Sequence, residues 1–270
     1  MDVREIDHSE RLTEHVRPGA DTALTIDGFS KRFGETVAVD ALSLTVPSGS
    51  FFGLVGPNGA GKTTALSMAV GLLRPDAGVA RIFGHDVWAD PVRAKEVVGV
   101  LPDGLSMPER LTGRELLTYT ARLRGLDRGT AGERADELLR VLELTDADGT
   151  MVIDFSAGMR KKIGLATALI HAPKLLVLDE PFEAVDPVSA STIRTILQRF
   201  VAAGGSVVLS SHVMALVEAL CDRVAVITHG QVVAAGTLSE VRGAGSLEDA
   251  FVHLVGGRVG GGEGLSWLAS

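Results

Sequence analysis

The chain has 270 residues, of which 46% are hydrophobic, and a formal net charge of −8. This length and composition can supply the core of one large domain, or of one domain with a subdomain. The negative charge argues against a main partner that is a nucleic acid, because such proteins normally present a broad basic face. We therefore expect a globular protein without a nucleic-acid partner.

The single cysteine, Cys221, lies in "EALCDRV". We expect it to be buried, and one thiol cannot form an internal disulfide, so a reducing compartment fits. No apolar run approaches the roughly 18 residues of a membrane-spanning helix, and the polar first residues do not resemble a secretory signal. We expect a soluble, cytoplasmic chain.

The first half of the chain alternates short strands with one helix. From Leu24 to Phe52, short apolar runs separated by Gly, Pro and Ser predict a mostly antiparallel layer that feeds a buried strand, "FFGLV". The segment "TTALSMAVGLL" has helical spacing, and "RPDAG" ends it before the next strand, "VARIF".

The second half predicts a helical insert followed by more buried strands. Residues 108 to about 170 have mainly helical patterns, and Thr112 with Glu115 forms a capping box. The strands "KLLVLDEP" and "SVVLSSH" flank a helix, "TIRTILQRFVAAG", and "HGQ" marks a final hairpin. This alternation predicts an α/β domain with a largely parallel core sheet.

The segment "GPNGAGKTT" matches G-x-x-x-x-G-K-[S/T] between a predicted strand and a predicted helix. Glycines let the backbone N–H groups curl around phosphates, Lys62 adds a positive charge, and the Thr63 hydroxyl can ligate Mg²⁺. The alternative is a glycine-rich turn. The predicted nucleotide-binding residues are Gly56, Pro57, Asn58, Gly59, Ala60, Gly61, Lys62, Thr63 and Thr64.

Two further strand ends carry polar residues. In "LLVLDEP", Asp179 is placed to hold Mg²⁺ and Glu180 to polarise an attacking water; alternatively, the acid pair caps the next helix. In "SSH", His212 follows an apolar strand at the end where α/β sheets gather ligands, although it could simply begin a helix. A second anion site is indicated by Ser156 and Gly158 in "DFSAGM", where a predicted helix begins.

In their order, "GPNGAGKTT", "FSAGM", "LLVLDEP", "VDP" and "SSH" resemble the nucleotide-binding domain of the ATP-binding cassette (ABC) family over about residues 22–240. The segment "FSAGMRKKIGLATALIHAPKLLVLDEP" is similar to bacterial export-type (ABC-2-like) ATPase subunits, whose membrane permease is a separate polypeptide. The resemblance implies an α/β P-loop NTPase core, an N-terminal antiparallel β subdomain and a helical signature subdomain.

The resemblance also implies roles for single residues. Phe33 would stack on adenine, although it could be a core phenylalanine, and His212 would contact the γ-phosphate. Two domains would close head to tail, so that Ser156 and Gly158 hold the partner's ATP and Asp186 lies in the loop between paired subunits. Asp103 stands where the family has glutamine and could still ligate Mg²⁺.

The signature departs from the family's LSGGQ. Ala157 replaces a glycine and tolerates fewer backbone angles, and Met159 removes an amide. These departures leave open a weakly catalytic partner of a heterodimer, and an ABC ATPase acting on nucleic acid or the ribosome is a further alternative.

The leading hypothesis is an ATPase that binds ATP and Mg²⁺, pairs with a second such subunit as a homodimer, and drives a separate permease from the cytoplasmic face of the membrane. We expect a polar extension over residues 1–21 and the ATPase domain over 22–240, with its helical subdomain at about 105–170. Residues 241–270 would form a short helix and a glycine-rich tail.

Overall fold

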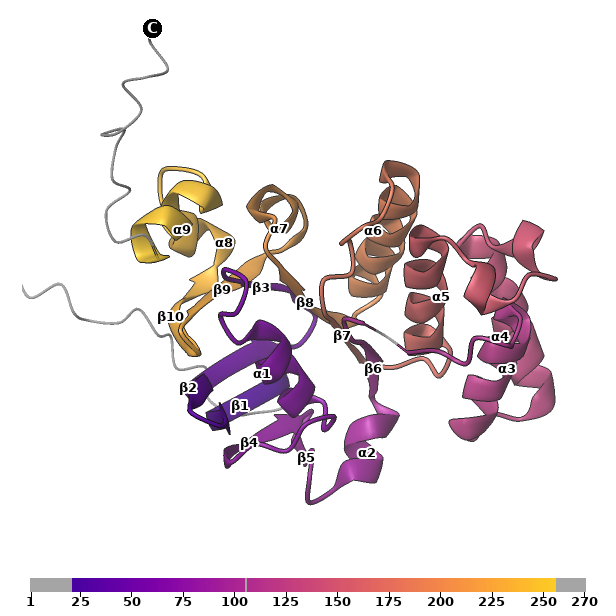
Figure 1. The fold of residues 1–270 in the computed structure, drawn as a ribbon, viewed down its shortest axis with the longest axis horizontal. Coiled ribbons are helices and arrows are strands. Elements are labelled where there is room, and N and C mark those ends of the chain that lie inside the picture. The colour runs from indigo at the N-terminus through magenta and orange to yellow at the C-terminus, as the bar shows by residue number, and fades with distance from the viewer. Residues whose placement is uncertain (1–20, 105, 256–270) are drawn as a thin grey trace, which may run out of the picture.

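The computed structural model describes residues 21–104 and 106–255, which build two β-sheets surrounded by helices (Figure 1). The predicted extension before residue 21 and the glycine-rich tail after residue 255 lie outside the described residues. The antiparallel sheet has the order β2-β1-β4-β5. Its strands are β1 (Thr22–Phe33), β2 (Thr36–Pro47), β4 (Ala77–Ile82) and β5 (His85–Asp86).

The second sheet has the order β10-β9-β3-β8-β7-β6, and only the edge strand β10 runs antiparallel to its neighbour. The predicted largely parallel core sheet and the predicted antiparallel layer before it are both confirmed. The strands are β3 (Phe51–Val55), β6 (Val98–Leu101), β7 (Leu175–Leu178), β8 (Ser206–Ser211), β9 (Arg223–Thr228) and β10 (Gln231–Thr237). The last two strands form the hairpin predicted at "HGQ".

The helices cover the parallel sheet on both faces (Figure 1). They are α1 (Lys62–Ala69), α2 (Pro91–Glu96), α3 (Gly113–Leu123), α4 (Arg128–Val141), α5 (Ala157–Leu169), α6 (Pro187–Ala202), α7 (Met214–Leu220), α8 (Leu238–Arg242) and α9 (Leu247–Val255). Two 3₁₀ turns lie at Thr145–Ala147 and Val152–Asp154. Within the described ranges, none of these helices has the length and apolar character needed to cross a membrane.

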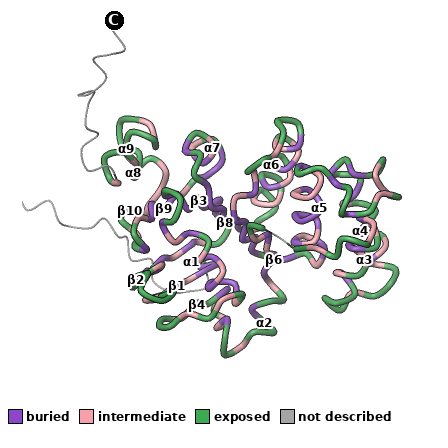
Figure 2. The backbone as a smooth tube through the Cα atoms, in the orientation of Figure 1, coloured by how far each residue is buried: buried purple, intermediate pink, exposed green. Residues whose placement is uncertain are grey.

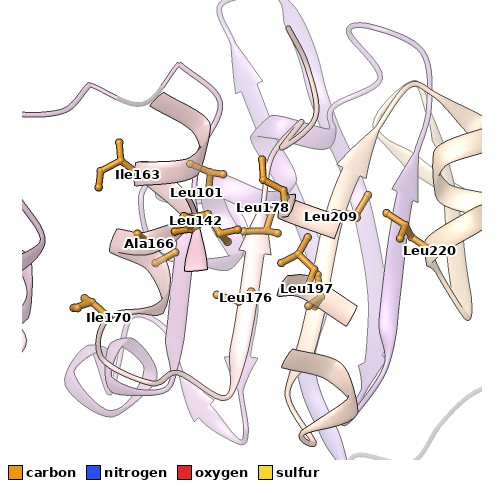
Figure 3. Packing of buried hydrophobic residues seen from close by; sticks show 14 of the residues in the cluster. Leu101, Leu142, Ile163, Ala166, Ile170, Leu176, Leu178, Leu197, Leu209 and Leu220 are labelled. Atoms are coloured by element: carbon orange, nitrogen blue, oxygen red, sulfur yellow. The ribbon is translucent and has the colours of Figure 1, made fainter. Parts of the chain in front are cut away.

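The parallel sheet is buried on both faces, so alternate residues of one strand enter two different cores (Figure 2). In β7, Leu176 and Leu178 pack with the helical side of the molecule, and Figure 3 shows them beside Leu197 of α6, in the same cluster as Ala166 of α5. The other face of the sheet packs with α1 and the antiparallel sheet. Helices α1 and α5 therefore belong to opposite cores.

The predicted helical insert consists of α3, α4 and α5. The capping box at its start is confirmed, because the Thr112 hydroxyl accepts from the Glu115 N–H and the Glu115 carboxylate accepts from the Thr112 N–H. The predicted burial of Cys221 is also confirmed, and burial raises the pKa of its thiol. After the hairpin, α8 and α9 close the described chain; α9 is the short helix predicted near the C-terminus.

His171, just beyond α5, makes stability depend on pH. Its Nε2 lies 3.0 Å from the Val98 carbonyl oxygen, and burial together with Arg124 and Arg134 lowers its pKa from 6.5 to about 4. As the pH falls from 6.5 to about 4, His171 binds a proton in the unfolded chain but stays neutral in the folded chain. The free energy of unfolding therefore falls. After allowance for solvent screening, we expect a loss of about 1–2 kcal/mol.

The variant His171→Gln keeps a donor for the Val98 carbonyl but has no group that titrates. Urea unfolding between pH 7 and 4 should therefore give this variant a flatter stability profile than the original protein. Parallel profiles would contradict the assignment of the pH dependence to His171.

Candidate active site

The carboxyl ends of four parallel strands bring most of the sequence-predicted residues to one edge of the sheet (Figure 1). Strand β3 leads into the loop that begins at Gly56, β6 leads to Asp103, β7 to Asp179 and Glu180, and β8 to His212. This is the edge at which open α/β sheets bind their ligands.

The glycine-rich loop has the strand, turn and helix context that its motif requires. Gly61 has φ +101°, and a Cβ there would lie 2.3 Å from the Ala38 carbonyl oxygen, so no other residue fits. Helix α1 begins at the next residue, and no side chain caps its N-terminus. Uncapped backbone N–H groups and a helix dipole are features that favour the binding of a phosphate.

Lys62 lies buried between this loop and the acidic end of β7. Its Nζ donates to the carbonyl oxygens of Gly56 at 2.8 Å and Pro57 at 3.2 Å, and lies 4.0 Å from Glu180 Oε1. Burial lowers the pKa of Lys62, against the opposing effect of Glu180 and Asp179. An entering phosphate would offer the ammonium a charged partner in place of two carbonyls.

Asp179 and Glu180 are joined by a third residue, Ser210. The Ser210 hydroxyl donates to Asp179 Oδ1 at 2.5 Å and accepts from the Glu180 N–H at 2.9 Å. Ser210 is fully buried at the end of β8. The sequence prediction used "SSH" only for its histidine and missed Ser210; the signal was a serine ending an apolar strand, where a buried hydroxyl needs partners.

Glu180 and His212, predicted separately, lie together. His212 Nδ1 is 3.1 Å from Glu180 Oε1, with the glutamate side chain 12% and the histidine side chain 43% exposed. The alternative that the acid pair caps the next helix is wrong, because Asp186 caps α6. The alternative that His212 begins a helix is wrong too, since α7 starts at Met214 with Val213 as its N-cap.

Phe33 is the last residue of β1, and its relative exposure of 52% rules out the core phenylalanine considered as an alternative. It pairs with Thr36 of β2, the strand that brings the Ala38 carbonyl against Gly61 of the phosphate loop. The half-exposed ring therefore lies on the hairpin that contacts the loop, with Lys31 Nζ 5.7 Å from its centroid. An aromatic base can stack on the exposed part of its face.

Ser156 and Gly158 lie at the start of α5, the helix on the opposite side of the sheet from α1. The Ser156 hydroxyl is exposed and caps the helix by accepting from the Met159 N–H at 3.2 Å. A Cβ at Gly158 would lie 2.8 Å from Asp186 Oδ2 and 2.9 Å from Ser189 Oγ. Gly158 thus allows α5 to pack against the start of α6 in the same chain, a role that sequence reasoning missed.

Asp186 caps α6 by accepting from the backbone N–H groups of Val188 and Ser189. The bond from the Ser189 N–H is the largest of the effects that lower the pKa of this carboxyl. The carboxylate is therefore held ionised beside Gly158, which links the loop after β7 to the start of α5.

Asp103 faces a lysine that the sequence analysis did not single out. Its Oδ1 lies 3.8 Å from Lys161 Nζ, and the same Nζ donates to the Glu180 carbonyl oxygen at 2.8 Å. Lys161 lies on α5, and its contact with Glu180 joins two distant positions of the chain. A pattern of neighbouring residues in the sequence does not predict such a contact.

The donor set at the strand ends fits a magnesium ion. Within the described part of the chain, no three His, Cys, Asp or Glu side chains group as a protein-only metal cage. Mg²⁺ usually binds one or two carboxylates together with substrate phosphates. Asp179, which is 4% exposed and has one oxygen held by Ser210, and Thr63 at the start of α1 supply oxygen donors of this kind.

Residues 39–183 match the family model described as ABC transporter. The chain is 41% identical over 220 residues to the daunorubicin/doxorubicin resistance ATP-binding protein DrrA of Streptomyces peucetius, covering 82% of this chain and 67% of that one. It is 37% identical over 229 residues to the Nod factor export ATP-binding protein I of Sinorhizobium fredii, covering 85% and 67%. A solved ATP-binding subunit of an ABC transporter superposes with a TM-score of 0.80 at 28% identity, over 86% of this chain and 99% of that one.

The family model covers more than half of the sequence, and the fold, the phosphate loop and the acidic strand end agree with it. The predicted fold class, a P-loop core with an antiparallel β layer and a helical part, is confirmed. The chain therefore belongs to the ABC transporter family, as one of its ATP-hydrolysing subunits.

Proposed function

We propose that this protein is the ATPase subunit of an exporter, which works with a separate membrane permease at the cytoplasmic face of the membrane. The observation that carries the proposal is the cluster at the sheet edge, where Glu180 Oε1 lies 4.0 Å from Lys62 Nζ and 3.1 Å from His212 Nδ1. The direction of transport, export, is supported by the names of the two relatives, one a resistance protein and the other an export protein.

In the proposed reaction, Glu180 accepts a proton from the attacking water. The Glu180 carboxylate is the general base. His212 contacts Oε1 of this carboxylate, orients the carboxylate and contacts the γ-phosphate. Lys62 leaves the loop carbonyls for the phosphates, and Phe33 stacks on the adenine.

Thr63 and Asp179 would hold Mg²⁺, with Asp103 as a third candidate ligand. When bound, the ion would supply positive charge that neutralises the charge developing on the phosphate. Ser210 keeps one Asp179 oxygen occupied, so the other oxygen is available for the ion. The Asp103 carboxylate faces Lys161, and its role as a metal ligand stays a prediction.

Two copies of the chain would close head to tail around two ATP molecules. The position of α5 supports this arrangement: Ser156 is exposed at the start of a helix that packs in the core opposite to that of α1. An exposed serine at an N-terminus, away from the chain's own phosphate loop, suits a phosphate that another subunit holds. Asp186, between α5 and α6, would lie at the subunit interface.

The two departures in the signature do not distort it. Ala157 is the first helical residue of α5 and is not among the residues with positive φ, so it adopts angles open to any residue. Met159 is partly buried against the helical core, and its N–H still meets the Ser156 hydroxyl. These contacts support a catalytically competent subunit. They therefore favour a homodimer over the alternative of a weakly catalytic partner in a heterodimer.

The function is tested by measuring phosphate release by the purified protein, alone and reconstituted with a multi-spanning membrane protein sought among the products of the neighbouring genes. We expect Mg²⁺-dependent ATP hydrolysis that rises when the permease is present. Stimulation by DNA or ribosomes, with no response to the permease, would contradict the transport role and support the nucleic-acid alternative.

A further inference from the structure

The backbone of Glu180 has an unusual conformation. Its φ is +45°, in the left-handed region that residues other than glycine rarely adopt. Such a conformation persists only where surrounding groups hold it, and it is found preferentially at functional sites.

Side chains from two other elements bind the two polar backbone groups of Glu180. Its N–H donates to Ser210 Oγ of β8 at 2.9 Å, and its carbonyl oxygen accepts from Lys161 Nζ of α5 at 2.8 Å. The same carbonyl also accepts from the Glu183 N–H at 3.2 Å. A charged donor makes the bond from Lys161 stronger than a neutral one.

Lys161 is the one cation of the run "RKK" that is directed at the strand end. Arg160 donates to the carbonyl oxygens of Ile153 and Phe155, and Lys162 pairs with Glu143 at 3.5 Å. The Lys161 side chain is 18% exposed and has Asp103 Oδ1 at 3.8 Å. Asp103 therefore supplies the negative charge that favours an ammonium at this half-buried position.

We propose that Lys161 is a positioning residue for ATP hydrolysis, which holds the backbone of Glu180 so that its carboxylate meets His212, with Asp103 as the counter-ion of the lysine. The proposal rests on the proposed role of Glu180 as general base. It gives Asp103 a function through Lys161 rather than through the metal ion.

The position of Lys161 on α5 also connects dimer closure with ATP hydrolysis. Lys161 lies five residues after Ser156, about 7.5 Å along the same helix. The helix whose first turn would face the partner's ATP is thus the helix that holds this chain's general base. Movement of α5 on dimer closure would act directly on Glu180.

The test compares Lys161→Met, Lys161→Arg and the control Lys95→Met, which removes a lysine from the exposed surface of α2. We expect Lys161→Met to lower kcat about tenfold while the Kd for a fluorescent ATP analogue changes less than about twofold. Lys161→Arg should recover most of kcat, because a guanidinium can donate to the same carbonyl. Lys95→Met should leave both constants unchanged.

Unchanged kcat in Lys161→Met would overturn the proposal, as would losses of kcat, nucleotide affinity and Tm together in both Lys161 variants, which would show a purely structural role. If Glu180→Gln turns over normally, the proposed role of Glu180 as general base, on which this inference rests, fails. If Glu180→Gln is inactive while Lys161→Met is normal, only the present inference fails.

Asp103→Asn and the double variant with Lys161→Met test the counter-ion. If Asp103 acts through Lys161, Asp103→Asn should lower kcat when it is the only substitution. In a chain that already carries Lys161→Met, it should have little further effect on kcat. The Mg²⁺ concentration at half-maximal activity should stay the same. A rise in that concentration, with additive losses of kcat, would show that Asp103 serves the metal instead and would overturn this part of the proposal.

Discussion

Replacing Glu180 with glutamine should abolish steady-state ATP hydrolysis while leaving ATP binding intact. The amide keeps the shape of the side chain, and the backbone bonds of residue 180 to Ser210 and Lys161 do not depend on the carboxylate. Removing a general base typically lowers a rate by about 10²- to 10⁴-fold. Binding persists because the phosphate loop is untouched, so ATP should trap the dimer.

Size-exclusion chromatography with ATP and phosphate-release assays measure the two effects in the same preparation. We expect the variant to elute as a dimer with ATP and as a monomer after ATP is removed. Asp179→Asn is not a suitable control, because it alters the bond with Ser210. Normal turnover of Glu180→Gln would contradict the assignment of the base.

Lys62→Met should strongly weaken nucleotide binding. The methionine fills most of the buried space but removes the one cation that lies between the loop carbonyls and Glu180 in the described site. Hydrogen bonds to charged groups contribute about 1.5–3 kcal/mol each, so losing one or two should weaken ATP binding at least about tenfold to a hundredfold.

The same substitution removes the ammonium that lies 4.0 Å from the Glu180 carboxylate, so the fold must be checked by thermal unfolding. We expect Lys62→Met to unfold cooperatively at a Tm within a few degrees of the original protein. A folded variant that binds a fluorescent ATP analogue with unchanged Kd would contradict the role of Lys62.

The sequence was sufficient where function depends on local backbone. The strand, glycine-rich loop and helix around Gly56 to Thr64 were predicted correctly, because they are neighbours in the chain; the roles of the loop residues in binding stay predictions. The capping box at Thr112 and the final hairpin were predicted for the same reason. Each of these features is specified by residues within a few positions of one another.

Contacts between distant segments could not be predicted in this way. Ser210 joins Asp179 across 31 positions, and Lys161 reaches the Glu180 carbonyl across 19. The packing of Gly158 against Asp186 also depends on how α5 meets α6. Such contacts follow from the order of the strands and the crossing of the helices, which residue patterns constrain only in outline.

The central claim, that each ATP is shared by two chains, can be tested by mixing two inactive variants. Lys62→Met damages the phosphate loop only. Ser156→Asp damages the signature only: aspartate caps a helix as well as serine does, but its charge repels a phosphate. Ser156→Asn, which caps without charge, is the matched control for the second variant.

A one-to-one mixture should regain ATP hydrolysis that neither variant shows alone. In a mixed dimer, the intact loop of the Ser156→Asp chain faces the intact signature of the Lys62→Met chain, so one complete site forms. Random pairing predicts about a quarter of the original activity per chain. If the mixture stays as inactive as its components while both variants still pair, each ATP is held within one chain, and the head-to-tail account is wrong.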